Sequence, residues 1–293
     1  KTEKEIKRLG NILKSEKRIK NIIVKDLENV IKNYDKPRKT TIIDEKKVIV
    51  PDEEILIEDY NVRMYLTKEG YLKKVPLVSL RGNTKQKLKD TDYVMQEIDT
   101  TNKSDVLLFS NKHTVYKLRI YELEDTKTSS FGEYIPNLLE LDGDEEILYM
   151  VCTEDYTGSM LFFFENGKGA RIDLKSYETK TNRRQLLNAY SDSSKLVRMM
   201  YLEEDTEVVL HSDIDKILVV DTSQIGIKTH RSSAGVILMR HKKDKKTKVQ
   251  SKVINVKDLE DVSFKDKDYY KSNIPAVGKY LKKEDKIHKQ LKI

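Results

Sequence analysis

A recurring pattern of strand, turn and strand is the feature that most constrains the fold of this chain. Four segments each combine an apolar strand, a short turn and a second strand that contains basic residues; they are 62–74, 106–119, 160–175 and 208–221. With Gly70, His113, Gly167 and Asp215 as equivalent turn positions, successive turns are 43, 54 and 48 residues apart. Such segments are typical of β-hairpins, and a period just under 50 residues indicates one small sheet per repeat.

Further apolar segments lie between the hairpins and can complete each sheet. They are 93–98, 146–152, 196–202 and 236–240. Four-stranded sheets arranged around an axis or along a spiral expose only short edges, which is how propeller-like proteins avoid pairing edge to edge. The sequence therefore predicts an all-β, propeller-like domain of four or five blades over residues 60–256.

The two ends of the chain have a different character. Residues 1–34 carry apolar side chains three or four positions apart, which predicts an amphipathic helix, and Pro37 disfavours its continuation. We expect residues 39–59 to form a linker. Residues 257–293 are lysine-rich and interrupted by Pro275 and Gly278, so they are predicted to be a basic flexible tail.

The charge of the chain is unevenly distributed. The net charge is +7 at pH 7, with 36% charged and 38% hydrophobic residues. Residues 60–120 contribute +6, residues 121–160 contribute −10 and residues 236–293 contribute +9. Because Lys and Arg supply most of the non-specific affinity of proteins for DNA, this alternation favours one basic edge over a uniformly basic body.

Several other chemistries find no support in the residues. The single cysteine, Cys152, excludes an intramolecular disulfide and a cysteine-based zinc site, and the five histidines lack metal-ligand spacing. No segment has the ~20 apolar residues that span a bilayer, and the N-terminus does not resemble a secretion signal, so we expect a cytoplasmic protein. A first residue other than Met suggests a fragment of a longer protein.

The repeated region resembles the C-terminal domain of the A subunits of bacterial type IIA topoisomerases, the family of DNA gyrase and topoisomerase IV. The matching segments are EDYNVRMYLTKEGYLKKVPL (58–77), LLFSNKHTVYKLRIYEL (107–123), PNLLELDGDEEI (136–147) and SSAGVILMR (232–240), in the family's order and spacing. Residues 5–42 resemble the end of the coiled-coil arm of the same type of subunit. The resemblance extends over nearly all of residues 1–256.

This resemblance implies a β-pinwheel whose outer rim binds and bends double-stranded DNA, preceded by the end of a coiled-coil arm. It implies no catalysis by this fragment, since the cleaving tyrosine lies outside the matched regions, and no cofactor here, with ATP and Mg used elsewhere in the enzyme. It further implies two protein partners, which are a topoisomerase B subunit plus a second A subunit, and a location in the cytoplasm with the nucleoid.

One family motif is incomplete. Residues 80–86, LRGNTKQ, correspond to the Gln-Arg-Arg-Gly-Gly-Lys-Gly box of gyrases and keep its Arg, Gly and Lys, but lack the second Gly and the preceding Arg. This departure argues against strong wrapping and the introduction of negative supercoils. Gyrase-like and topoisomerase IV-like activities both remain open.

Bending DNA around a protein requires cations along a curved path, because they neutralise the phosphates on the inner face of the bend. We predict that the second strands and the connecting loops supply them. The candidate DNA-binding residues are Lys73, Lys74, Arg81, Lys85, Lys87, Lys117, Arg119, Arg171, Lys175, Arg183, Arg184, Lys228 and Arg231. The fourth hairpin, with Lys216 among three aspartates, is expected to bind weakly.

Two other classes of function are compatible with repeated hairpins. A propeller that binds protein partners would show the same repeats without basic residues at equivalent positions. An enzyme built on a propeller would gather Asp, Glu or His at one central mouth, and the sequence shows no such convergence.

Overall fold

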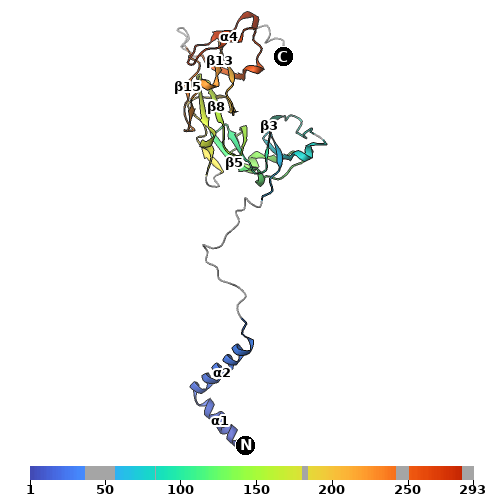
Figure 1. Ribbon diagram of the computed structural model, residues 1–293, viewed down its shortest axis with the longest axis vertical. Coiled ribbons are helices and arrows are strands. Elements are labelled where there is room, and N and C mark those ends of the chain that lie inside the picture. Colours follow the sequence, from blue (N-terminus) through green and yellow to red (C-terminus); the bar gives the residue numbers. More distant parts are fainter. Residues whose placement is uncertain (37–56, 83, 180–183, 242–250, 286–293) are drawn as a thin grey trace. The chain divides into compact units, whose positions relative to one another are not determined.

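The computed structural model divides the chain into two compact units, Lys1–Leu56 and Ile57–Ile293 (Figure 1). It describes residues 1–36, 57–82, 84–179, 184–241 and 251–285. The expected linker therefore lies largely outside the described residues.

The first unit contains two helices where the sequence predicts one stripe. They are α1 (Thr2–Leu13) and α2 (Glu16–Tyr34), separated at Ser15, which adopts an extended backbone. Neither helix buries any residue, and apolar side chains such as Leu13 and Ile31 are more than half exposed. The apolar stripe of this unit is thus unpartnered in the described residues.

The second unit contains the four predicted hairpins. Their strands are β1 (Asn61–Thr67) with β2 (Tyr71–Pro76), β4 (Asp105–Ser110) with β5 (Thr114–Arg119), β8 (Ser159–Phe164) with β9 (Lys168–Asp173), and β12 (Glu207–Ser212) with β13 (Lys216–Asp221). All four turn residues, Gly70, His113, Gly167 and Asp215, have a positive φ, which confirms that these positions are equivalent. His113 and Asp215 adopt at 58° and 55° a conformation that Gly adopts more readily.

Each hairpin lies in the middle of a sheet, which we number as blades 1 to 4. The strand beside the first hairpin strand is called the inner strand: β3 (Val94–Thr101), β7 (Ile147–Thr153), β11 (Leu196–Leu202) and β16 (Val253–Asp258). Consecutive inner strands contact one another, β3 with β7, β7 with β11 and β11 with β16. The inner strands therefore line one common side of the blades.

The strand at the opposite end of each sheet is called the outer strand. The outer strands are β6 (Glu133–Tyr134), β10 (Gln185–Leu187), β15 (Val236–Ile237) together with the parallel β14 (Ile227–Lys228), and β17 (Lys279–Tyr280). In blades 1 to 3 the outer strand follows the hairpin of the next blade in sequence. Consecutive blades are interlocked by this return of the chain, an arrangement that the spacing of the hairpins did not predict.

Three hydrophobic clusters join consecutive blades. Val62 and Leu108 belong to the cluster between blades 1 and 2, Phe109 and Phe162 to that between blades 2 and 3, and Phe163 to that between blades 3 and 4. Within the described residues no such cluster joins blade 4 to blade 1. The blades form an open series, which follows the colour order from β3 to β13 in Figure 1.

The structure corrects the expected domain boundary at residue 256. Residues 251–285 form β16, the short helix α4 (Lys267–Tyr270) and β17, all of which belong to blade 4. The side chain of Tyr270 is fully buried in a cluster with Val219 and Leu259 that covers the free face of this blade. The high lysine content of this segment conceals the few apolar residues that anchor it.

The other short helix, α3 (Ile135–Leu139), follows the outer strand of blade 1.

Candidate nucleic-acid interface

Four of the predicted DNA-binding cations do not face solvent. Lys73, Lys74, Lys117 and Arg171 are between 0% and 9% exposed. Their side chains lie within the blades, where hydrogen bonds and, for three of them, carboxylates satisfy the charged groups. These four residues leave the candidate set, because a buried cation cannot neutralise a phosphate on the surface.

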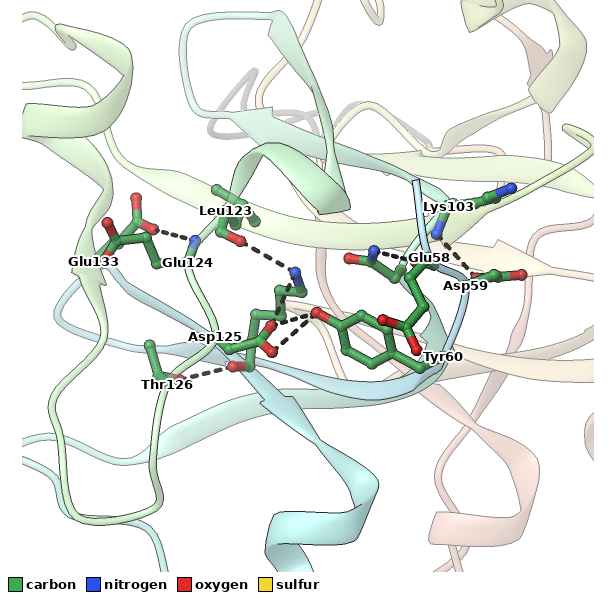
Figure 2. A network of polar contacts seen from close by, with 11 residues as sticks. Glu58, Asp59, Tyr60, Lys103, Leu123, Glu124, Asp125, Thr126 and Glu133 are labelled. Carbon is green, nitrogen blue, oxygen red and sulfur yellow. Dashed lines mark hydrogen bonds and ion pairs between the residues drawn. The ribbon is translucent and has the colours of Figure 1, made fainter. Parts of the chain in front are cut away.

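Lys74 belongs to the polar network around Asp125, of which Figure 2 labels Tyr60, Leu123 and Asp125. Its ammonium group lies 2.9 Å from Oδ1 of Asp125 and donates a hydrogen bond to the carbonyl oxygen of Leu123. The hydroxyl group of Tyr60 donates to the same carboxylate at 2.8 and 2.9 Å, and its ring lies under the ammonium group. Burial and the neighbouring carboxylate raise the pKa of Tyr60 to about 12. Together these groups form a polar network that holds the buried ammonium group beside a partly exposed carboxylate.

Blade 2 repeats this arrangement around Lys117. Its ammonium group lies 2.8 Å from Oδ2 of Asp105, and the hydroxyl group of Tyr156 donates to the same oxygen at 2.6 Å. The ring of Tyr156 lies 5.0 Å from the ammonium group. Both ionised side chains are about nine-tenths buried, at 10% and 12% exposed.

Blade 3 uses an arginine at the same position. Arg171 pairs with Asp205 at 2.7 Å and donates through Nε to the hydroxyl group of Ser159 at 2.9 Å. Lys74, Lys117 and Arg171 each lie four residues after the turn residue of their hairpin, and blade 4 has Val219 there. The recurrence that suggested a DNA-binding rim is a buried cation paired with a carboxylate, which is buried in blade 2 and partly exposed in blades 1 and 3.

Lys73 is buried without a carboxylate partner among the described residues. Its ammonium group donates to the carbonyl oxygen of Thr128 at 3.2 Å, and its side chain is fully buried. Burial lowers the pKa of Lys73 to about 8, because a low-dielectric environment disfavours the charged form.

The remaining candidates of blade 1 lie together in the loop after β2. Arg81, Lys85 and Lys87 are exposed. The backbone N–H of Lys87 donates to the carbonyl oxygen of Thr128 at 2.8 Å, and its ammonium group lies 4.6 Å from the ring centre of Phe131. The loop is therefore fixed to the segment that leads into the outer strand β6. Arg81 and Lys85 also belong to the segment that resembles the gyrase box.

In blade 2 the remaining described candidates are either half-buried or paired with a carboxylate. Arg119 is half-buried with its guanidinium group 5.9 Å from the ring of Tyr121, and exposed Arg184 forms an ion pair of 2.9 Å with Glu122. Arg183 lies outside the described residues.

Blade 3 brings three predicted residues together at its outer edge. Lys228 lies on β14 beside Ile172 of β9, and Lys175 follows β9 in a short 3-10 helix. The guanidinium group of Arg231 donates to the carbonyl oxygen of Ser176 at 3.0 Å, directly after Lys175. Lys175 and Lys228 are exposed.

Blade 4 carries cations that lie outside the predicted set of DNA-binding residues. The ammonium group of Lys216 lies 4.9 Å from the ring of Tyr280, and Lys279 and Lys282 lie over the ring of Tyr269 at 4.5 and 3.8 Å. Lys89 of blade 1 lies over Tyr71 in the same way and was also missed, although it continues the alternation of Lys85 and Lys87. Lys279 and Lys282 were missed because they belong to the expected tail. The expected weak binding by this blade stays a prediction.

No candidate metal site accompanies this surface in the part of the chain that the structure describes. Its His, Cys, Asp and Glu residues form no group of three or more that could hold a metal ion. Cys152 lies in β7 against the hydrophobic cluster between blades 1 and 2. Burial raises the pKa of its thiol to about 12, which disfavours the reactive thiolate. Among the described helices, none is long and apolar enough to cross a membrane.

The chain is similar in sequence to the A subunits of two bacterial topoisomerases. It is 34% identical over 185 residues to the DNA gyrase A subunit of Campylobacter jejuni, and 27% identical over 181 residues to the DNA topoisomerase 4 A subunit of Bacillus subtilis. Each match includes 60% of this chain and only 21% or 22% of the relative, so the chain spans about a fifth of their length. No family model matches the chain.

The fold is also that of solved domains. The C-terminal domain of DNA topoisomerase IV superposes with a TM-score of 0.59 over 69% of this chain and 62% of that domain, at 24% identity. The E. coli ParC C-terminal domain superposes with a TM-score of 0.60 over 76% of this chain and 95% of that domain, at 10% identity. The chain is thus a homologue of the A subunits of DNA gyrase and topoisomerase IV, and its second unit has the β-pinwheel fold of the C-terminal domain of topoisomerase IV.

Proposed function

We propose that the second unit binds double-stranded DNA without sequence specificity along the outer edge of its blades and bends it. The observation that carries this proposal is the position of the exposed cations in blades 1 and 3. Arg81 follows β2, while Lys175 and Lys228 lie beside β9, so all three belong to the outer half of their sheets. Their side chains form no hydrogen bond or ion pair with another described residue. Exposed cations of this kind can neutralise phosphates without first breaking an internal pair.

The kinship with topoisomerase A subunits supports the same proposal at the level of the whole enzyme. We infer that this unit guides duplex DNA for a type IIA topoisomerase that controls DNA topology with ATP and Mg. ATP, Mg and the cleaving tyrosine would then belong to other parts of the enzyme, and this fragment would need no cofactor. Its protein partners would be a topoisomerase B subunit plus a second A subunit, in the cytoplasm with the nucleoid.

The incomplete box at residues 80–86 favours bending over tight wrapping. It keeps Arg81, Gly82 and Lys85 but has Asn83 and Thr84 before the lysine. With fewer cations fixed in the loop, less of the elastic cost of bending, which is on the order of 1–6 kcal/mol for ~20–30 base pairs, is offset.

A topology assay tests this function. The chain is bound to a nicked circular duplex, the nick is ligated, and the linking number of the product is compared with that of naked circles. We expect a shift that grows with protein concentration, and an affinity that falls steeply with salt. An unshifted linking number together with salt-independent binding would show that the unit does not bend DNA and would favour a protein-binding propeller.

A further inference from the structure

Each outer strand ends in the same backbone contact. The carbonyl oxygen of the hairpin turn residue accepts a hydrogen bond of 2.8–2.9 Å from the chain just after the outer strand. The donors are the N–H groups of Ile135, Ala189, Leu238 and Leu281, and the acceptors are Gly70, His113, Gly167 and Asp215. This contact fixes one register for the outer strands of all four blades.

The same register exposes one large apolar side chain in every blade. Tyr134, Leu187, Ile237 and Tyr280 each pair with the residue that directly follows the turn. Their side chains are 41%, 59%, 46% and 64% exposed. The residues whose N–H groups make the backbone contact are buried in blades 1 to 3 and half-buried in blade 4. The exposed residues, which we call the outer apolar row, therefore occupy equivalent positions along the series of blades.

The row differs from the apolar patches that bind proteins. Such patches are contiguous, whereas the row has one residue per blade at this position, and Ile227 of β14 is a further exposed apolar residue of the outer strands. Cations accompany it: Lys216 lies 4.9 Å from the ring of Tyr280, Lys168 pairs with Ile237, and Lys89 lies over Tyr71, whose ring is 5.2 Å from that of Tyr134. Isolated apolar contacts between cations match a duplex, in which apolar deoxyribose lies between phosphates.

We propose that the outer apolar row contacts the deoxyribose edge of the minor groove, once per blade, while the neighbouring cations bind the phosphates. This inference rests on the proposed DNA binding and adds a contact that carries no charge. Apolar side chains that pack against the sugars remove apolar surface from water, so they add affinity that does not depend on neutralising phosphates. The row would thus set the position of the duplex on the blades, and the cations would set the strength of its attraction.

The test is a variant with Tyr134→Ala, Leu187→Ala, Ile237→Ala and Tyr280→Ala, compared with the wild-type chain across a range of salt. We expect about tenfold weaker binding with an unchanged slope of log K against log salt, because the slope counts phosphate contacts. The linking-number shift should decrease as well. The pair Leu187→Ala and Ile237→Ala, which leaves both tyrosine contacts intact, serves as a second variant and should show the same effect at reduced size.

Ile254→Ala is the matched control. Ile254 is 55% exposed and lies on β16, at the opposite edge of blade 4 from Tyr280. Wild-type affinity in both row variants would overturn this inference and leave the proposed DNA binding intact. If the wild-type chain itself does not bind DNA, the proposed function fails, and the inference with it.

The absence of tryptophan from the sequence allows a direct second measurement. Tyr280→Trp introduces a single tryptophan in the row, and Ile254→Trp introduces one at the inner edge. We expect duplex DNA to change the emission of Trp only in the first variant, with the same half-saturation as binding. Unchanged emission throughout that titration would count against contact between the row and DNA.

Discussion

The cations of this domain belong to two regions of each sheet that differ in what surrounds them. In the second hairpin strand, Lys74, Lys117 and Arg171 are buried and lie within 3 Å of a carboxylate. Beside the outer strand, Arg81, Lys175 and Lys228 are exposed. Residues of the same type, a few positions apart in the chain, therefore serve the interior in one region and the surface in the other.

This difference shows how a polar repeat can hold a blade together. A charge buried with its partner gains little net stability, because the loss of hydration offsets the attraction. Removal of one partner is costly, because the other charge stays buried without compensation. Blade 4, with Val219 in the same position and an apolar cluster around it, folds without the pair. The buried cation is thus one of two ways to fill this position.

Among these variants, Lys117→Ala should give the largest change in the free energy of unfolding. Asp105 would keep the hydrogen bond from Tyr156 but lose its cation, so we expect the free energy of unfolding to fall by about 3–5 kcal/mol. Urea denaturation measures this loss. The double variant Lys117→Ala and Asp105→Ala, which removes both charges, should recover part of it. A loss below about 1 kcal/mol for the single variant would mean that Asp105 does not depend on Lys117 for compensation of its charge.

The exposed cations Arg81, Lys175 and Lys228 should contribute to DNA binding and not to stability. Arg81→Ala, Lys175→Ala and Lys228→Ala together should leave the free energy of unfolding within about 0.5 kcal/mol of the wild type. The slope of log K against log salt should decrease by about 2.7, which corresponds to roughly 100-fold weaker DNA binding at 0.15 M salt. Fluorescence anisotropy with a labelled duplex over several salt concentrations measures both quantities.

A charge-matched control separates position from net charge. Lys103, Lys195 and Lys257 are exposed and lie at or next to the inner strands. Their replacement by Ala removes the same charge and should leave the slope nearly unchanged. Equal losses in the two triple variants would eliminate any special role for the outer edge.

Much of the fold follows from local patterns, and part of the site does not. The hairpins and their turns could be predicted, because strand alternation and turn residues are local in the sequence. The interlocking outer strands could not, since β6 and β10 are two or three residues long and acquire their register from contact with a distant turn. The ordered segment 251–285 was missed for a related reason, because few apolar residues such as Leu259 and Tyr270 anchor it.

The candidate DNA-binding residues could be predicted only in part, for the same reason. Whether a basic residue in a strand faces a carboxylate depends on residues far away in the sequence, such as Asp125 for Lys74 and Asp205 for Arg171. A signal was nevertheless present. Lysines in a strand between apolar neighbours, as in Tyr71-Leu72-Lys73-Lys74-Val75, cannot both face solvent in an alternating strand.

Lys73 gives an effect of intermediate size that depends on pH. Its pKa is about 8 in the folded protein and 10.5 in the unfolded chain, so the unfolded state binds more protons between these values. The free energy of unfolding of the wild type should therefore rise by about 2 kcal/mol from pH 8 to pH 10 relative to Lys73→Met. Denaturation of both proteins at several pH values measures the difference, in which the titration of other groups cancels. Parallel pH profiles would show that Lys73 titrates as an exposed lysine.

Arg184→Ala should have the smallest effect on the free energy of unfolding. It allows a direct comparison of an exposed cation with the buried Lys117 of the same blade. The backbone N–H of Lys117 in β5 donates to the carbonyl oxygen of Arg184 at 2.7 Å, and Arg184 directly precedes the adjacent strand β10. The pair of Arg184 with Glu122 is 66% and 37% exposed, and an exposed pair contributes about 0–1 kcal/mol. We expect a loss below about 0.5 kcal/mol that disappears at high salt, against several kcal/mol for Lys117→Ala. Similar losses at both positions would mean that solvent exposure does not distinguish the two sets of cations.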